Sequence, residues 1–208
     1  YAGICSVENL QPNSNDYFHV ESLDEMTAFL TSGGGTTCGT TPATSNTLPT
    51  VSAGSNYTIP MSTPFTLTAS GSDGNGDALT YAWEEFDLGT ASSSVATAST
   101  DDGSRPLFRS YSPTTSPSRT FPSLTYILNN ANVPPTTYAC TAFPTTCLTG
   151  EVLPSKNRTM TFQVTARDNR SGGGGIVTAS MQATVTTSAG SFQVTSPNTA
   201  ISVAGGNT

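Results

Sequence analysis

Few side chains in this chain of 208 residues could do chemistry, and histidine is among the scarcest of them. His19 is the single histidine, in a polar stretch, NDYFHVES, that precedes an apolar periodic segment. Hydrolysis by bound zinc takes about three protein ligands and a carboxylate base. One histidine cannot supply them, so we expect His19 to be a hydrogen-bonded residue that anchors its loop.

The stretch SDGNGDAL is a second candidate, because Asp73, Asn75 and Asp77 alternate as the ligands of a calcium loop do. Glu84 stands at the twelfth position from Asp73, where an EF-hand has its last ligand. However, alanine occupies the position that requires glycine, and the following residues have a strand pattern. Two interpretations stay open: a calcium site that includes Asp168, or a solvated turn rich in Asx side chains, which the sequence favours.

The acidic run Glu84, Glu85 and Asp87 could be taken for a general acid and base. Neighbouring side chains on a strand point to opposite faces, so Glu84 and Glu85 cannot flank one bond. We expect this run to be a solvated strand edge. Serine-rich stretches such as ASSSV lack a Gly-x-Ser-x-Gly context and a histidine partner, which argues against nucleophilic catalysis.

Four cysteines, Cys5, Cys38, Cys140 and Cys147, lie among turn residues, without a Cys-x-x-Cys motif or partnering histidines. This arrangement disfavours zinc and indicates two disulfides formed in an oxidising compartment. Three pairings are possible, and we expect the two local ones, Cys5 with Cys38 and Cys140 with Cys147. Free buried thiols are the alternative.

The composition limits the partners of the chain. Lys and Arg number 7 against 14 Asp and Glu, which gives a formal net charge of −7. With no basic cluster, we expect neither nucleic acid nor an anionic membrane as a partner. No apolar run approaches the roughly 20 residues that span a bilayer. The chain begins at Tyr1 and ends within a pattern, so we expect it to be part of a longer protein.

Strands are the main elements that would position these side chains. Between residues 49 and 188, apolar and polar residues alternate in runs separated by turn clusters such as NRSGGGG. This pattern predicts an all-β fold, an Ig-like antiparallel β-sandwich after an N-terminal loop and short helix, with Trp83 in the core. The expected core positions are Phe65, Leu67, Ala69, Leu79, Tyr81, Trp83, Met160, Phe162, Val164, Ala166, Val177, Ala179, Met181, Ala183 and Val185.

The ends of the chain differ from this β pattern. Residues 1–31 combine a polar loop with one helix, which Ser22 and Glu25 would begin as a capping box. Residues 32–48 form a Gly/Thr/Pro linker, and residues 189–208 are expected to start a further β module. So short a helix is marginal alone, so its apolar face should pack on the sandwich or a neighbour, or fray. That face consists of Leu23, Met26, Phe29 and Leu30.

Two blocks of the central region, LPTVSAG to YAWEEF and MTFQVTARD to MQATV, share several short motifs. The matching positions are Ala53–Gly54, Ser72–Asp73, Gly76–Asp77, Tyr81 with Trp83, and Val164 to Asp168. In these positions the chain resembles bacterial Ig-like modules of the polycystic-kidney-disease (PKD) and cadherin-like type. The resemblance implies an extracellular β-sandwich, in which residues 88–158 would be an insertion because they are too long for the usual connection.

The opening text YAGIC, followed by NLQPNSNDYFHVESLDEM, has a second resemblance. It is similar to the segment after the Met-turn in secreted bacterial reprolysin-like zinc proteases of the metzincin class. The resemblance implies that residues 1–31 are the end of a catalytic domain whose zinc-binding helix lies upstream. It also implies a catalytic role for Tyr1 in the intact parent alone. We therefore expect no peptidase activity here, and a parent zinc metalloendopeptidase that is secreted or displayed at the cell surface.

Two functions follow as expectations. One is a non-catalytic accessory domain, either a spacer and scaffold beside the upstream catalytic domain or a module that positions protein substrates of the parent. The other is an adhesion module for glycans or proteins of the cell surface or matrix. Glycan sites present flat aromatic surfaces, and a row of exposed aromatic residues in the insertion would favour adhesion. The aromatic candidates there are Tyr111, Phe121, Tyr126, Tyr138 and Phe143.

Overall fold

The computed structural model of the chain describes residue 5, residues 8–40, 42–129, 132–141 and 145–190, and four single residues beyond these ranges. Tyr1 and most of the expected further module at 189–208 lie outside the described residues. No helix within the described ranges is long and apolar enough to cross a bilayer.

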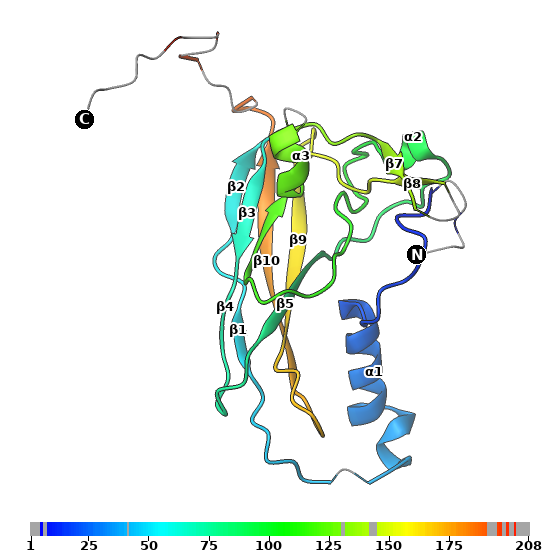
Figure 1. Ribbon diagram of the computed structural model, residues 1–208, viewed down its shortest axis with the longest axis vertical. Coiled ribbons are helices and arrows are strands. Elements are labelled where there is room, and N and C mark those ends of the chain that lie inside the picture. The colour runs from blue at the N-terminus through cyan, green and yellow to red at the C-terminus, as the bar shows by residue number, and fades with distance from the viewer. Residues whose placement is uncertain are drawn as a thin grey trace, which may run out of the picture.

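A four-stranded sheet is the largest element of the described chain (Figure 1). Its strand order is β2 (Tyr57–Pro60), β10 (Ile176–Thr186), β9 (Arg158–Arg167) and β5 (Thr80–Glu85). The pairs β10–β9 and β9–β5 are antiparallel, but β2 runs parallel to β10. The prediction of antiparallel pairing throughout is therefore wrong for β2. Parallel strands need a long connection, which the chain between β2 and β10 provides.

Two further strand pairs accompany the large sheet. They are β3 (Phe65–Thr68) with β6 (Ser118–Phe121), and β1 (Thr50–Ser52) with β4 (Ser70–Ser72). The ring of Phe121 lies 5.1 Å from that of Phe65 and 4.9 Å from that of Phe162 in β9. The β3–β6 pair therefore packs on the large sheet, with an aromatic cluster between them. The described chain is thus a β-rich fold made of several sheets.

Alternating positions of the strands fill this core. Trp83 is 3% exposed, as predicted, and its indole N–H donates to the carbonyl of Pro117 at 2.9 Å. The predicted core positions that prove buried are Phe65, Leu67, Ala69, Trp83, Met160, Phe162, Val164, Ala166, Met181, Ala183 and Val185. The buried apolar side chains follow the period of two because successive strand side chains point to opposite faces, although the polar residues Gln163 and Thr165 between them in β9 are buried as well.

The segment expected as an insertion is only partly separate from the core. Its strand β6 pairs with β3, and Phe121 is fully buried, so the prediction of Phe121 as a surface aromatic is wrong. The remaining elements of residues 88–158 are short: α2 (Val95–Ala98), α3 (Leu124–Asn129), β7 (Thr137–Ala139) and β8 (Thr146–Leu148). Strands β7 and β8 form an antiparallel pair.

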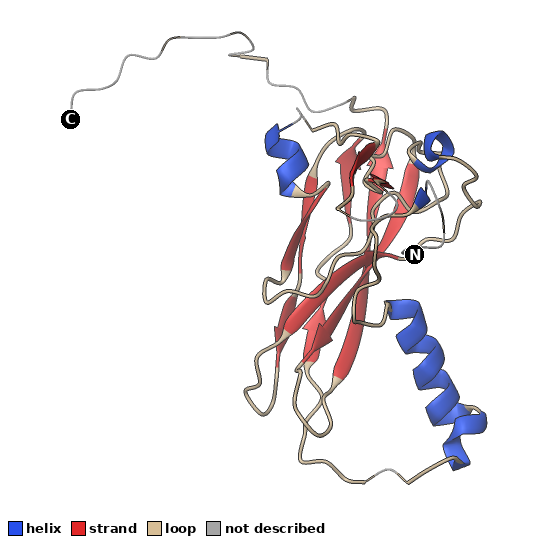
Figure 2. Cartoon of the chain, turned by 45° about the vertical axis from the view of Figure 1, so that its right-hand side comes forward, coloured by secondary structure: helices blue, strands red, loops and turns tan. Residues whose placement is uncertain are grey.

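The N-terminal helix α1 (Val20–Ser32) lies beside the strands, followed by the short 3-10 helix η2 (Gly34–Thr37) (Figure 2). The helix begins two residues before Ser22, so the predicted capping box with Glu25 is wrong. Instead, the carboxylate of Glu84 in β5 accepts a hydrogen bond from the first backbone N–H of the helix, as described below. Leu23 is buried, whereas the other three residues of the predicted apolar face are exposed.

Candidate functional site

The acidic end of β5 is the densest group of polar side chains with a clear geometry. We expected Glu84, Glu85 and Asp87 to be a solvated edge, and this prediction is wrong. The side chains of Glu84 and Glu85 are 4% and 0% exposed, and that of Asp87 is 14% exposed. Each carboxylate has partners from distant parts of the chain, which local sequence could not reveal.

Glu84 bonds to the segment that leads into α1. Its Oε1 lies 2.5 Å from His19 Nδ1 and accepts the Ser110 hydroxyl at 2.8 Å. Its Oε2 accepts the Val20 backbone N–H at 2.9 Å. Burial alone would raise the pKa of Glu84, but these hydrogen bonds outweigh it and hold the pKa below its usual 4.5. His19 thus anchors its loop through a carboxylate of β5.

The trio of Ser110, Glu84 and His19 contains the residue types of a hydrolase triad, but in the wrong order. In a nucleophilic triad the histidine lies between the hydroxyl and the carboxylate, so that it can take the hydroxyl proton. Here both Ser110 and His19 bond to the same oxygen of Glu84. The arrangement holds the segment in place and does not activate the serine.

We call Glu84, His19, Ser110 and Val20 the Glu84 cluster. Two further residues, Arg167 and Tyr17, complete its surroundings. Arg167 of β9 donates to the Phe18 carbonyl at 2.8 Å, and its guanidinium lies 5.8 Å from the Tyr17 ring. Burial, and then the charge of Glu84, raise the pKa of Tyr17 to about 12. Tyr17 therefore stays neutral at physiological pH.

Glu85, one residue further, points to the opposite side of β5 and meets Arg158. The guanidinium of Arg158 lies 3.0 Å from Asp101, 3.4 Å from Glu85 and 3.6 Å from Asp87. One cation thus faces three acidic side chains in a largely buried place. Desolvation, opposed by a backbone hydrogen bond and reinforced by Asp87, raises the pKa of Glu85 to about 8.

This Arg158 cluster joins loops to the sheet. Glu85 Oε2 accepts the backbone N–H groups of Leu107 and Phe108 at 2.6 and 3.0 Å. Asp101 Oδ2 accepts those of Ser155 and Lys156 at 2.8 and 3.1 Å. These contacts, and full burial, give the carboxylates a structural role and keep them from a substrate.

A second buried arginine acts in the same way. Arg119 of β6 donates to Glu151 at 3.1 Å and to the Trp83 carbonyl at 2.6 Å. Glu151 also accepts the Ser123 N–H at 2.6 Å. Burial raises the pKa of Glu151, opposed first by the Ser123 hydrogen bond and then by Arg119, and burial lowers the pKa of Arg119, opposed first by the charge of Glu151.

The aromatic candidates of the insertion do not form a row of exposed rings within the described residues. Tyr111 is 36% exposed, and the guanidinium of Arg119 lies 4.8 Å from its ring centre. Tyr138 and Tyr126 are partly buried, and the Tyr138 hydroxyl donates to the Leu10 carbonyl at 2.6 Å. Phe143 lies outside the described residues.

The Asp73 turn is held by its own hydrogen bonds. Asp73 Oδ1 accepts the N–H groups of Asn75 and Asp77 at 2.8 and 3.0 Å, and Asp77 pairs with Arg170 at 2.9 Å. Asp168 accepts the Gly175 N–H with both oxygens at 2.8 Å. The described residues contain no group of three or more His, Cys, Asp or Glu side chains that could hold a metal ion.

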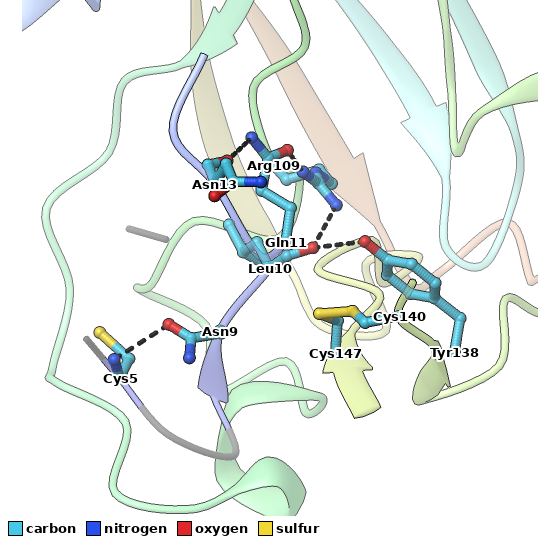
Figure 3. The surroundings of a disulfide bond; sticks show 9 residues. All are labelled: Cys5, Asn9, Leu10, Gln11, Asn13, Arg109, Tyr138, Cys140 and Cys147. Carbon is cyan, nitrogen blue, oxygen red and sulfur yellow. Dashed lines mark hydrogen bonds between the residues drawn. A yellow bond between two sulfur atoms is a disulfide. The ribbon is translucent and has the colours of Figure 1, made fainter. Parts of the chain in front are cut away.

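The cysteines divide into one disulfide and two free thiols. Cys140 and Cys147 are bonded, as predicted (Figure 3). The predicted Cys5–Cys38 bond is wrong, because both residues are free. Between them lies α1, whose 13 residues span about 20 Å, far more than a disulfide bridges.

Beside the disulfide, the N-terminal segment crosses the insertion through main-chain contacts (Figure 3). The Leu10 carbonyl accepts Arg109 at 2.8 Å as well as Tyr138, and the Asn9 carbonyl accepts the Leu148 N–H at 2.8 Å. An open cleft of about 350 Å³ lies along this crossing. Its walls are largely apolar and include Leu10, Pro106, Leu107, Phe108 and Leu148.

No protein-family model, curated protein or solved structure matches the chain. Its function is therefore argued from its own residues. The sequence identified His19, Glu84 and Glu85 as candidates, but missed Ser110, which bonds to Glu84, Arg158, which bonds to Glu85, and Asp101, which bonds to Arg158. These partners come from loops and strands 26 to 73 positions away, and no local pattern signals such pairings.

Proposed function

We propose that the chain is a non-catalytic accessory module of an extracellular protein, in which an Ig-like β-sandwich holds a neighbouring domain in place. The observation that carries the proposal is the exposed face of α1. Met26, Phe29 and Leu30 are 37%, 56% and 60% exposed, although the helix is fixed to β5 at its first residue. Large apolar side chains grouped on one helix are typical of half of a protein interface.

The hydrogen bonds made by the buried glutamates support the same proposal. Glu84, Glu85 and Glu151 are each bonded to backbone N–H groups and to basic or hydroxyl side chains. Groups engaged in this way stabilise loops and are not free to exchange protons with a substrate. Such a network suits a rigid spacer better than a reaction centre.

For the neighbour, we propose the catalytic domain of a secreted zinc metalloendopeptidase, joined upstream in the same chain. What supports this identity is the resemblance of the opening stretch to the end of such a domain, followed by a module of extracellular type. On this proposal, zinc belongs to the parent, and residues 1–31 belong to its catalytic domain.

A glycan- or protein-binding adhesion module is the second candidate. A hollow of about 200 Å³ lined by Tyr81, Tyr111 and several hydroxyl groups favours it. However, the rim hydroxyls of Thr114 and Ser116 donate to backbone carbonyls, at 3.4 and 3.2 Å. Because these groups are engaged, we favour the scaffold.

The test compares two proteins in a casein assay with added zinc. We expect no cleavage by residues 1–208, and chelator-sensitive cleavage by a chain extended upstream through the zinc ligands. In the longer chain, Phe29→Ser with Leu30→Ser should lower the melting temperature of the catalytic domain. Leu128→Ser, a control at a 74% exposed apolar residue of α3, should not. Chelator-sensitive cleavage by residues 1–208 alone would refute the proposal.

A further inference from the structure

The first residue of α1 receives its cap from the sheet. The preceding residue, His19, makes no side-chain cap hydrogen bond to the helix. Instead, the Val20 N–H donates to Glu84 of β5, which lies 64 positions along the chain. A carboxylate at this point satisfies a free N–H group and interacts favourably with the helix dipole. The charge of one side chain thus contributes to the attachment of α1.

The charged and titratable groups around Glu84 come from three elements. His19 and Tyr17 approach from the segment before α1, and Arg167 interacts with Glu84 from β9. The insertion contributes the neutral hydroxyl of Ser110. Because Tyr17 stays neutral, the local charge balance is one carboxylate against the guanidinium of Arg167. Removing the negative charge leaves only groups that are neutral or positive.

We propose that Glu84 and His19 form an acid-sensitive latch, which holds α1 at the edge of β5 at neutral pH and releases it when Glu84 is protonated. A protonated carboxyl group no longer carries the charge that favours the helix N-terminus. In addition, Arg167 then lies beside the segment without the negative charge of Glu84. Both changes favour the departure of the segment.

The direction of the pH dependence follows from the lowered pKa of Glu84. The folded-state pKa lies below the usual 4.5, so the charged carboxylate favours the attached state. This contribution is fully present above about pH 4.5 and is lost as the pH falls through the folded-state pKa.

Release would change the surface that α1 presents. Val20 and Leu23 are 3% and 9% exposed in the attached state. Their exposure would extend the apolar stripe of Met26, Phe29 and Leu30 along the whole helix. The latch goes beyond the proposed scaffold function and requires nothing about the identity of the neighbouring domain.

The chain offers a direct measurement of this movement. Trp83 is the single tryptophan and is fixed in the core, whereas Cys38 is an exposed free thiol beyond the far end of α1. In a Cys5→Ser background, a dansyl group on Cys38 accepts energy from Trp83. We expect constant transfer above about pH 5 and a clear loss below about pH 4.5. The emission wavelength of Trp83 should stay constant, which shows that the core remains folded.

Variants separate the latch from general acid effects. Glu84→Gln should lose transfer at neutral pH and show no acid step, whereas Glu25→Gln, a control at an exposed carboxylate of α1, should behave as the parent chain. A persisting step in Glu84→Gln, or a step that coincides with a shift in Trp83 emission, would overturn the proposal. Should Glu84→Gln fail to fold, His19→Gln decides: it should lower transfer near pH 6 with unchanged Trp83 emission, and unchanged transfer contradicts the latch.

Discussion

The sheets between Thr50 and Thr186 and the N-terminal segment from Glu8 to Thr40 are held by different forces. The sheets share an apolar core in which Phe121, Phe162 and Val164 are fully buried. The segment has only Val20 and Leu23 as buried apolar side chains among its described residues. Its other attachments are polar contacts, which include hydrogen bonds to its backbone carbonyls, a bond between Gln11 and Arg109, and the bonds to Glu84.

This difference indicates which region contributes most of the folding free energy and which region responds to pH. Burial of apolar surface is insensitive to pH and contributes most of the folding free energy. Hydrogen bonds to a single carboxylate contribute less and change with its charge. We therefore expect the sheets to tolerate loss of the segment, and the segment to respond to conditions that leave the sheets intact.

The largest expected effect concerns the apolar core between the sheets. Trp83→Ala should lower the free energy of unfolding by about 3 to 5 kcal/mol, because it leaves a cavity between the sheets. Phe29→Ala, at a ring that is 56% exposed on α1, should change it by less than about 0.5 kcal/mol. Urea unfolding followed by circular dichroism measures both. Equal effects would mean that α1 and the sheets unfold as one unit.

The next effect concerns the cysteines. Replacing both Cys140 and Cys147 by serine should cost about 2 to 3 kcal/mol, since the bond closes a loop over a separation of 7 residues. Cys5→Ser in the N-terminal segment removes no bond and should be nearly neutral. Thermal melting of the oxidised proteins measures the difference. A large loss from Cys5→Ser would show that the segment contributes to the stability of the sheets.

A third prediction contrasts the two adjacent glutamates. The pKa of Glu85 is raised to about 8, so its contribution to stability is complete below about pH 4.5 and is lost as the pH rises toward 8. Between pH 6 and 7 the free energy of unfolding should fall by about 1 kcal/mol from this group. Glu85→Gln should remove that slope, as urea titrations at several pH values would detect. Glu84→Gln should leave the slope in place, because the pKa of Glu84 is lowered and lies outside the range between pH 6 and 7.

The smallest effect on the sheets should come from breaking the helix itself. Thr27→Pro removes a hydrogen bond in the middle of α1, which costs a helix about 3 kcal/mol or more. The helical signal in circular dichroism should fall, while the urea midpoint of the sheets changes little. A midpoint lowered as much as by Trp83→Ala would contradict the separation of the two regions.

The parts of the fold that were predictable are those that depend on neighbouring residues. Alternation identified β3, β5, β9 and β10, because a buried strand face repeats every second residue. The parallel pairing of β2, the core position of Phe121 and the start of α1 depend on contacts between distant segments. For the same reason the prediction for the acidic run was wrong. Arg158, which bonds to the buried Glu85, lies 73 residues further along the chain.

The cap of α1 also sets the order in which the parts of this protein can form during synthesis. Glu84 follows Val20 by 64 positions, and ribosomes add roughly 5 to 20 residues per second. The helix segment therefore emerges about 3 to 13 seconds before the carboxylate that caps it. A 13-residue helix is marginal in water until it has tertiary support. On the nascent chain, α1 thus waits for β5, so this segment becomes ordered only after a later part of the chain has been made.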